Sequence, residues 1–149
     1  SKLDVLNGYG VDTILMDRKD PEIHKKAVFE RFPYGVDAIV DATGSASVLP
    51  DCFQLLKKQG RLLQFSSTKD DENITINPAY FYRNELQYYT SYCQVHEFGR
   101  AVDAIASGKV RLDKLVTWLY TLEQFPQAIE EVLDHSVLKL VIRPNGMED

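Results

Sequence analysis

The stretch VDAIVDATGS, residues 36–45, joins a run of β-branched and apolar side chains to an abrupt polar turn. The run over 36–42 is apolar enough for a strand buried on both faces, the usual state of a strand in a parallel sheet. Thr43, Gly44 and Ser45 then break the strand, and the glycine allows the backbone to approach a flat ligand closely. Asp41, placed before Thr-Gly, is expected to cap this turn. The stretch therefore predicts a parallel-sheet strand with a candidate binding site at its carboxyl end, where open α/β sheets hold their ligands.

The segments around this strand alternate between short apolar runs and helical periodicity. Further strands are predicted over residues 12–16, 61–65, 86–92 and 138–142. Helices are predicted over 2–7, after Pro78 and from Phe98 to Gly108. Two more are predicted from their caps, one from Pro21 with Asp20 as N-cap and one after the capping-box pair Thr121 and Gln124. A further helix is predicted from a cap at Ser47 to Gly60, with Leu49, Phe53 and Leu56 facing inward. Such alternation implies crossover connections between parallel strands, so the predicted fold class is α/β, a parallel sheet with flanking helices.

The composition is that of one globular domain. The chain has 149 residues, 44% of them hydrophobic, and a formal net charge of −5. Neither half is basic enough to displace counterions from nucleic acid, and no apolar run approaches the roughly 20 residues of a membrane-spanning helix. We therefore expect no nucleic-acid partner, no membrane partner and a cytoplasmic setting.

Side chains that could carry catalysis are scattered. The three histidines, His24, His96 and His135, lie on separate segments at spacings that do not suit zinc ligation. Cys52 and Cys93 are expected to be inert thiols. The patterns of a nucleophile elbow and of a phosphate-binding P-loop are absent from the sequence. The residues alone predict a binding domain with no catalytic residue and no metal ligand, and the polar strand ends could equally be simple turns.

Several short motifs follow one another along the chain in a characteristic order. They are VDAIVDATGS (36–45), LLKKQGRLL (55–63), AIASGKV (104–110), LVT (115–117), LE (122–123) with Ala128, and LKLVI (138–142). This succession resembles the signature of the cofactor half of zinc-dependent medium-chain alcohol and polyol dehydrogenases and covers residues 1–143. Within that family the sorbitol- and arabinitol-dehydrogenase branch is the most similar, on account of Tyr92-Cys93.

The resemblance implies a binding role for each polar strand end. Ala42, Thr43 and Gly44 would lie beside the nicotinamide ribose. Phe65, Ser66 and Ser67 would hold the nicotinamide face, and backbone groups of Tyr89, Thr90 and Ser91 would bind the carboxamide. Lys139 would reach the pyrophosphate, although an exposed lysine on an edge strand is the alternative interpretation.

The resemblance also implies parts that these residues do not contain. The family's cofactor domain begins with strands and a glycine-rich phosphate turn that have no counterpart here, and its zinc ligands belong to a separate catalytic domain. We therefore expect a partial Rossmann-type sheet over 1–143, lacking the first strands and the glycine-rich turn, followed by a polar tail over 144–149. Strands 12–16 and 36–42 would then lack neighbours, and their open edges would favour strand exchange or a partner chain.

The expected function follows from the family. The chain would be a fragment of an NAD- or NADP-dependent alcohol or polyol dehydrogenase, supplying the nicotinamide-side wall for hydride transfer from a secondary alcohol in a homo-oligomeric protein. Zinc is expected only in the catalytic domain, and whether the isolated chain is an enzyme stays open. The alternative is a non-catalytic, homo-oligomerising interaction module derived from this fold, with the aromatic segment 74–92 as its interface.

Overall fold

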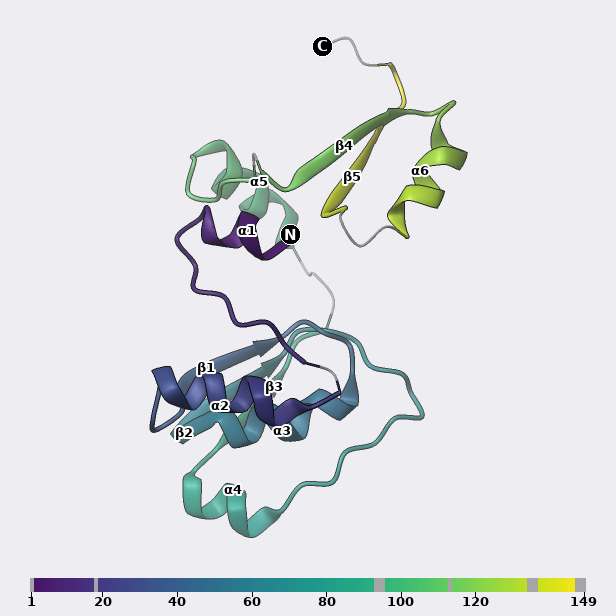
Figure 1. Cartoon of the computed structure of the whole chain (residues 1–149). Coiled ribbons are helices and arrows are strands. Elements are labelled where there is room, and N and C mark those ends of the chain that lie inside the picture. The colour runs from purple at the N-terminus through teal and green to yellow at the C-terminus, as the bar shows by residue number, and fades with distance from the viewer. Residues whose placement is uncertain (1, 18, 93–95, 113, 134–136, 147–149) are drawn as a thin grey trace. The chain divides into compact units, whose positions relative to one another are not determined.

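The computed structural model describes all residues except 1, 18, 93–95, 113, 134–136 and 147–149. The chain divides into two compact units, one of residues Ile14–Cys93 and one of Ser1–Thr13 together with Gln94–Asp149 (Figure 1). Both units combine helices with parallel strands, so the predicted α/β class is confirmed. Over the described residues, no helix is both long and apolar enough to cross a bilayer.

The first unit is built on a three-stranded parallel sheet in the order β1-β2-β3. Its elements are α2 (Pro21–Arg31), β1 (Val36–Asp41), the 3-10 turn η1 (Ala46–Val48), α3 (Leu49–Leu55), β2 (Leu56–Gln64), α4 (Pro78–Asn84) and β3 (Gln87–Thr90). Helix α2 starts as predicted, because the Asp20 side chain accepts a hydrogen bond from the N–H of Glu22 and a proline fills the first turn. Helices α2 and α3 lie beside each other next to the sheet (Figure 1).

The core of this unit lies between α3 and the sheet. Leu62 of β2 is fully buried, and Leu49, Cys52, Phe53 and Leu56 complete the buried cluster. The ring of Phe53 meets the edges of two further rings, Phe81 at 4.7 Å and Tyr88 at 5.4 Å. Edge-to-face aromatic contacts of this kind stabilise a core beyond the area that they bury.

Two predictions about helix α3 are wrong. Helix α3 ends at Leu55, well before Gly60, because Leu56 is already extended and pairs with Val36 of β1. Gly35 allows this early end, since a Cβ there would lie 2.6 Å from the Leu55 carbonyl oxygen. Ser47 lies inside η1, and the N-cap position of α3 is Val48.

The predicted strand over 12–16 is also wrong. Residues 11–17 have no regular secondary structure, since a strand needs a hydrogen-bonded neighbour and no described strand pairs with them. Strand β1 pairs only with β2 among the described strands, so it forms an edge of this sheet, and Val40 on it is 62% exposed. Pairing of this edge with another chain stays a prediction.

The second unit contains a two-stranded parallel sheet. Its elements are α1 (Lys2–Asn7), α5 (Phe98–Ala106), β4 (Val116–Thr121), α6 (Phe125–Val132) and β5 (Lys139–Arg143). Strand β4 was not predicted, and β5 lies one residue later than predicted. Before α6, the Thr121 N–H donates to Gln124 Oε1 at 3.0 Å, which is one half of the predicted capping box. Cys93 and His135 lie outside the described residues, and the division into parts 1–143 and 144–149 stays a prediction.

Candidate functional site

The carboxyl ends of β1, β2 and β3 meet at one edge of the sheet. Because the three strands are parallel, Asp41 of β1 pairs with Gln64 of β2, and Gln64 pairs with Thr90 of β3. The structure thus brings together nine of the ten predicted site residues: Ala42, Thr43, Gly44, Phe65, Ser66, Ser67, Tyr89, Thr90 and Ser91. Lys139, the tenth, begins β5 in the other compact unit.

The buried carboxylate of Asp41 connects the ends of β1 and β2. Asp41 is only 3% exposed. Its Oδ1 accepts hydrogen bonds from the Thr43 N–H at 3.0 Å and the Thr43 hydroxyl at 2.7 Å, and its Oδ2 accepts from the Ser66 hydroxyl at 2.8 Å. The first two bonds confirm the predicted turn cap, whereas the bond from Ser66 crosses to the neighbouring strand end.

These hydrogen bonds also set the charge of Asp41. Burial by itself raises the pKa of a carboxyl group, because it disfavours the charged form. The hydrogen bonds from Thr43 and Ser66 outweigh that burial and lower the pKa of Asp41 below its usual value. The group is therefore an anion at neutral pH, and its hydrogen bonds hold Thr43 and Ser66 in place.

Gly44 brings the turn after β1 close to the turn after β2. Its φ is +71°, a left-handed conformation that side chains other than glycine adopt at a cost. A Cβ on Gly44 would lie 3.0 Å from the Ser67 carbonyl oxygen. Glycine is favoured here on both grounds, whereas the predicted close approach to a flat ligand stays a prediction.

A cavity of about 450 Å³ opens between the ends of β2 and β3. We name it the β2–β3 cavity, and its lining residues are Gln64, Phe65, Ser66, Ser67, Thr68, Asp70, Thr90, Ser91 and Tyr92. Phe65 is 61% exposed and so offers an open aromatic face. Hydroxyl groups supply most of the polar side-chain atoms, which suits an uncharged, flat and polar ligand group.

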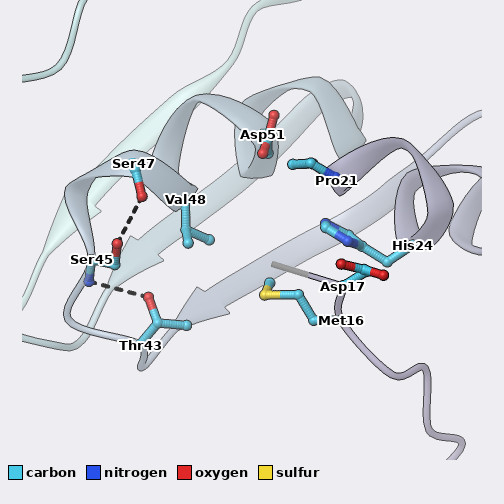
Figure 2. Close-up of a pocket in the computed structure, with 9 residues that line it drawn as sticks. All are labelled: Met16, Asp17, Pro21, His24, Thr43, Ser45, Ser47, Val48 and Asp51. Atoms are coloured by element: carbon cyan, nitrogen blue, oxygen red, sulfur yellow. Dashed lines mark hydrogen bonds between the residues drawn. The ribbon is translucent and has the colours of Figure 1, made fainter. Parts of the chain in front are cut away.

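A second cavity, also of about 450 Å³, lies between the turn after β1 and helix α2 (Figure 2). We name it the β1–α2 cavity, and it is lined by Met16, Asp17, Pro21, His24, Thr43, Ser45, Ser47, Val48 and Asp51. Thr43 lines this cavity and not the β2–β3 cavity. Figure 2 shows the Thr43 side chain accepting a hydrogen bond from the Ser45 N–H at 3.3 Å.

The residues of α2 and of the segment before it were missed by sequence reasoning. His24 is only 7% exposed, and within the described part of the chain its Nδ1 has no hydrogen-bond partner. Asp17 accepts hydrogen bonds from the N–H groups of Lys19 at 2.7 Å and Asp20 at 3.1 Å, and these lower its pKa. Neither residue belongs to a motif, and the folded structure brings both to the cavity, His24 from α2 and Asp17 from the segment before it.

The described residues do not fit a zinc ion. They contain no cluster of three histidine, cysteine or carboxylate side chains that could ligate one. Burial raises the pKa of the Cys52 thiol to about 11, so this group stays protonated, whereas zinc binds thiolate. Cys52 is accordingly a core side chain.

The family is shown by comparison with known proteins. Residues 1–107 match the family model described as zinc-binding dehydrogenase. The chain belongs to this family. D-arabinitol dehydrogenase 1 from Uromyces fabae is 32% identical over 130 residues, which cover 87% of this chain and 37% of that protein. Sorbitol dehydrogenase from Bacillus subtilis (strain 168) is 27% identical over 113 residues, 74% of this chain and 32% of that protein.

Solved structures of other proteins share the fold of this chain. The short chain alcohol dehydrogenase from E. coli CFT073, complexed with NADH, superposes with a TM-score of 0.80 at 19% identity. The match covers 95% of this chain and 41% of that one. The chain thus spans about a third of the length of the curated relatives it matches.

A nicotinamide dinucleotide, the cofactor that this family implies, fits the residues present. Gly44 lets the turn after β1 pack against the Ser67 carbonyl, which places the turns after β1 and β2 side by side at the edge where a dinucleotide would lie. One cavity includes Thr43 after β1 and the other includes the ends of β2 and β3, and open α/β sheets bind dinucleotides at this edge. The hydroxyl-rich lining and the ionised Asp41 behind it suit ribose and carboxamide groups better than a metal ion.

Proposed function

We propose that the chain forms the nicotinamide-side wall of the cofactor site in an NAD- or NADP-dependent alcohol or polyol dehydrogenase. The observation that carries the proposal is the meeting of the three strand ends at one edge of the sheet, where Asp41 joins β1 to β2 and where Ser66 and Ser91 line one cavity. The protein would transfer a hydride from a secondary alcohol to the nicotinamide ring. The curated relatives named for arabinitol and sorbitol support a polyol as the substrate.

The two cavities suggest how the dinucleotide would lie. The nicotinamide half would occupy the β2–β3 cavity, with the open face of Phe65 against the ring and backbone groups of Tyr89, Thr90 and Ser91 near the carboxamide. The adenosine half would occupy the β1–α2 cavity. Ala42, Thr43 and Gly44 would then follow the ribose and pyrophosphate between them, and Lys139 would add a positive charge to the pyrophosphate.

The remaining parts of the proposal concern the whole protein. Zinc would be held by residues outside this sequence, where it polarises the alcohol oxygen as a Lewis acid. We also propose a cytoplasmic protein that assembles as a homo-oligomer. In support of assembly, Phe125 and Ile129 on α6 are 48% and 52% exposed, and exposed apolar side chains of this kind are available for contact with a second copy.

A nucleotide titration of the isotope-labelled chain by NMR tests the cofactor site. Nicotinamide mononucleotide at millimolar concentration should shift the amide signals of Ser66, Ser67 and Ser91, and ADP-ribose should shift those of Thr43 and Ser45. Amide shifts detect binding too weak for fluorescence. If neither nucleotide shifts any of these signals and sedimentation shows a stable oligomer, the homo-oligomerising interaction module replaces the dehydrogenase proposal.

A further inference from the structure

Gln64, the last residue of β2, forms hydrogen bonds with the turn that follows β2 and with β3 and its end. Its side-chain Oε1 accepts a hydrogen bond from the Tyr88 hydroxyl, and its Nε2 donates to the Ser66 carbonyl oxygen at 3.2 Å. Its main-chain carbonyl accepts from the Ser91 N–H at 3.1 Å. Gln64 also lines the β2–β3 cavity, so these bonds converge on the wall of that cavity.

Tyr88 determines which way the Gln64 amide points. A tyrosine hydroxyl that donates its proton must face the amide oxygen, and the amide NH₂ must then face the other way, toward the Ser66 carbonyl. The Tyr88 ring is held against the core by a T-shaped contact with Phe53, with 5.4 Å between ring centroids. Burial raises the pKa of Tyr88, so its hydroxyl keeps the proton that it donates.

The turn after β2 has two attachments, and only one depends on Tyr88. The Ser66 N–H donates to the Asp41 carbonyl at 3.2 Å, and the Ser66 hydroxyl donates to Asp41 Oδ2. These bonds hold the amino side of the turn whatever Gln64 does. The Ser66 carbonyl, on the side that leads to Ser67 and the cavity, is held by the Gln64 amide.

We propose that Tyr88 is a positioning residue for the nicotinamide half of the cofactor, acting through Gln64 on the Ser66–Ser67 peptide. The inference rests on the proposed function, because it assigns the β2–β3 cavity to the nicotinamide half. Without the Tyr88 hydroxyl, the Gln64 amide loses the hydrogen bond to its oxygen, and only the bond to the Ser66 carbonyl orients it. The Ser66–Ser67 peptide then samples more conformations, and binding must select one of them.

The test compares Tyr88→Phe with the matched control Tyr80→Phe. The Tyr80 hydroxyl donates to the Phe53 carbonyl at 3.4 Å and lies outside the β2–β3 cavity, so both variants lose one partly buried hydroxyl bond in the same unit. The dissociation constants of nicotinamide mononucleotide and ADP-ribose are measured by NMR for each variant. Thermal unfolding of both variants shows whether the fold is kept.

We expect Tyr88→Phe to weaken nicotinamide mononucleotide about fivefold, the factor that one neutral hydrogen bond typically contributes. ADP-ribose should stay within about twofold, and Tyr80→Phe should change neither. In a second arm, Gln64→Leu should weaken nicotinamide mononucleotide at least as much, and adding Tyr88→Phe should weaken it no further, since both act through one amide.

Three results would distinguish a failure of the positioning role of Tyr88 from a failure of the proposed function. If the unsubstituted chain binds nicotinamide mononucleotide and Tyr88→Phe binds it equally well, the positioning role of Tyr88 is refuted while the proposed function stands. Equal weakening of both nucleotides by Tyr88→Phe also refutes it, because a general loss of structure affects both cavities. If the unsubstituted chain binds neither nucleotide, the proposed function fails and the inference fails with it.

Discussion

Replacing Asp41 should loosen the site and destabilise its compact unit, and the replacement Asp41→Asn isolates the effect of charge. Three hydrogen bonds end on this carboxylate, two from Thr43 and one from Ser66. Bonds to a charged group contribute about 1.5–3 kcal/mol each when the partners are buried. Thr43 is exposed and Ser66 half-buried, so both can turn to water once the acceptor is lost.

The expected loss follows from that reasoning. Asp41→Ala removes all three bonds, and we expect it to lower the free energy of unfolding by about 3 kcal/mol. Asp41→Asn keeps one acceptor oxygen for Thr43 and can donate to the Ser66 hydroxyl, so its loss should be about 1.5 kcal/mol. Urea unfolding followed by circular dichroism measures both. Asp37→Asn is the matched control, because this carboxylate of the same strand is exposed and its ion pair with Lys57 lies at the surface.

The pH dependence has a definite sign. The pKa of Asp41 is lower in the folded protein than in the unfolded chain, where it is about 3.9. Its contribution is therefore complete above about pH 5 and is lost as the pH falls through the folded value. The difference in unfolding free energy between the unsubstituted chain and Asp41→Asn should shrink below about pH 4. A difference that stays constant down to about pH 2, or an Asn variant as stable as the unsubstituted chain at neutral pH, would refute the assignment.

Three further predictions concern side chains near the site. Gly44→Ala should lower the unfolding free energy by about 1–2 kcal/mol, because it combines a positive φ with a contact of 3.0 Å to a backbone carbonyl; urea unfolding measures it. Lys25→Met should lower the unfolding free energy by about 1 kcal/mol, because the 11%-exposed Lys25 side chain binds three acceptors. Lys26→Met, at a 79%-exposed position, should change the unfolding free energy little. In a Cys93→Ser background, Cys52 should react with a thiol reagent at about pH 8 only as fast as the chain opens, since its pKa is about 11; an immediate reaction without denaturant would contradict its burial.

Elements with strong local signals were predicted well. The strand β1 was predicted from its β-branched run and the polar turn after it, and α2 from Asp20 followed by Pro21. The cap formed by Asp41 was also predicted, because an aspartate can bond to the backbone two residues later. Each of these features depends on residues within a few positions of one another.

Elements whose limits depend on distant partners were predicted poorly. The helical pattern of residues 49–60 continues past Leu55, but pairing of Leu56 with β1 overrides it. Residues 12–16 look like a strand and are not one, whereas β4 was overlooked and pairs with β5. A strand is stable only when a neighbour satisfies its backbone groups, and the periodicity of one segment does not contain that information.

The amino-acid sequence alone was enough to indicate the α/β class, the family resemblance and the three polar strand ends, because these depend on local periodicity and on the order of short motifs. The folded arrangement was needed to divide the predicted residues between two cavities, to connect Thr43 with Ser66 through one buried carboxylate, and to bring His24 and Asp17 beside the turn after β1. These contacts join residues far apart in the chain. Their geometry is set by strand register and helix packing, which only the three-dimensional structure specifies.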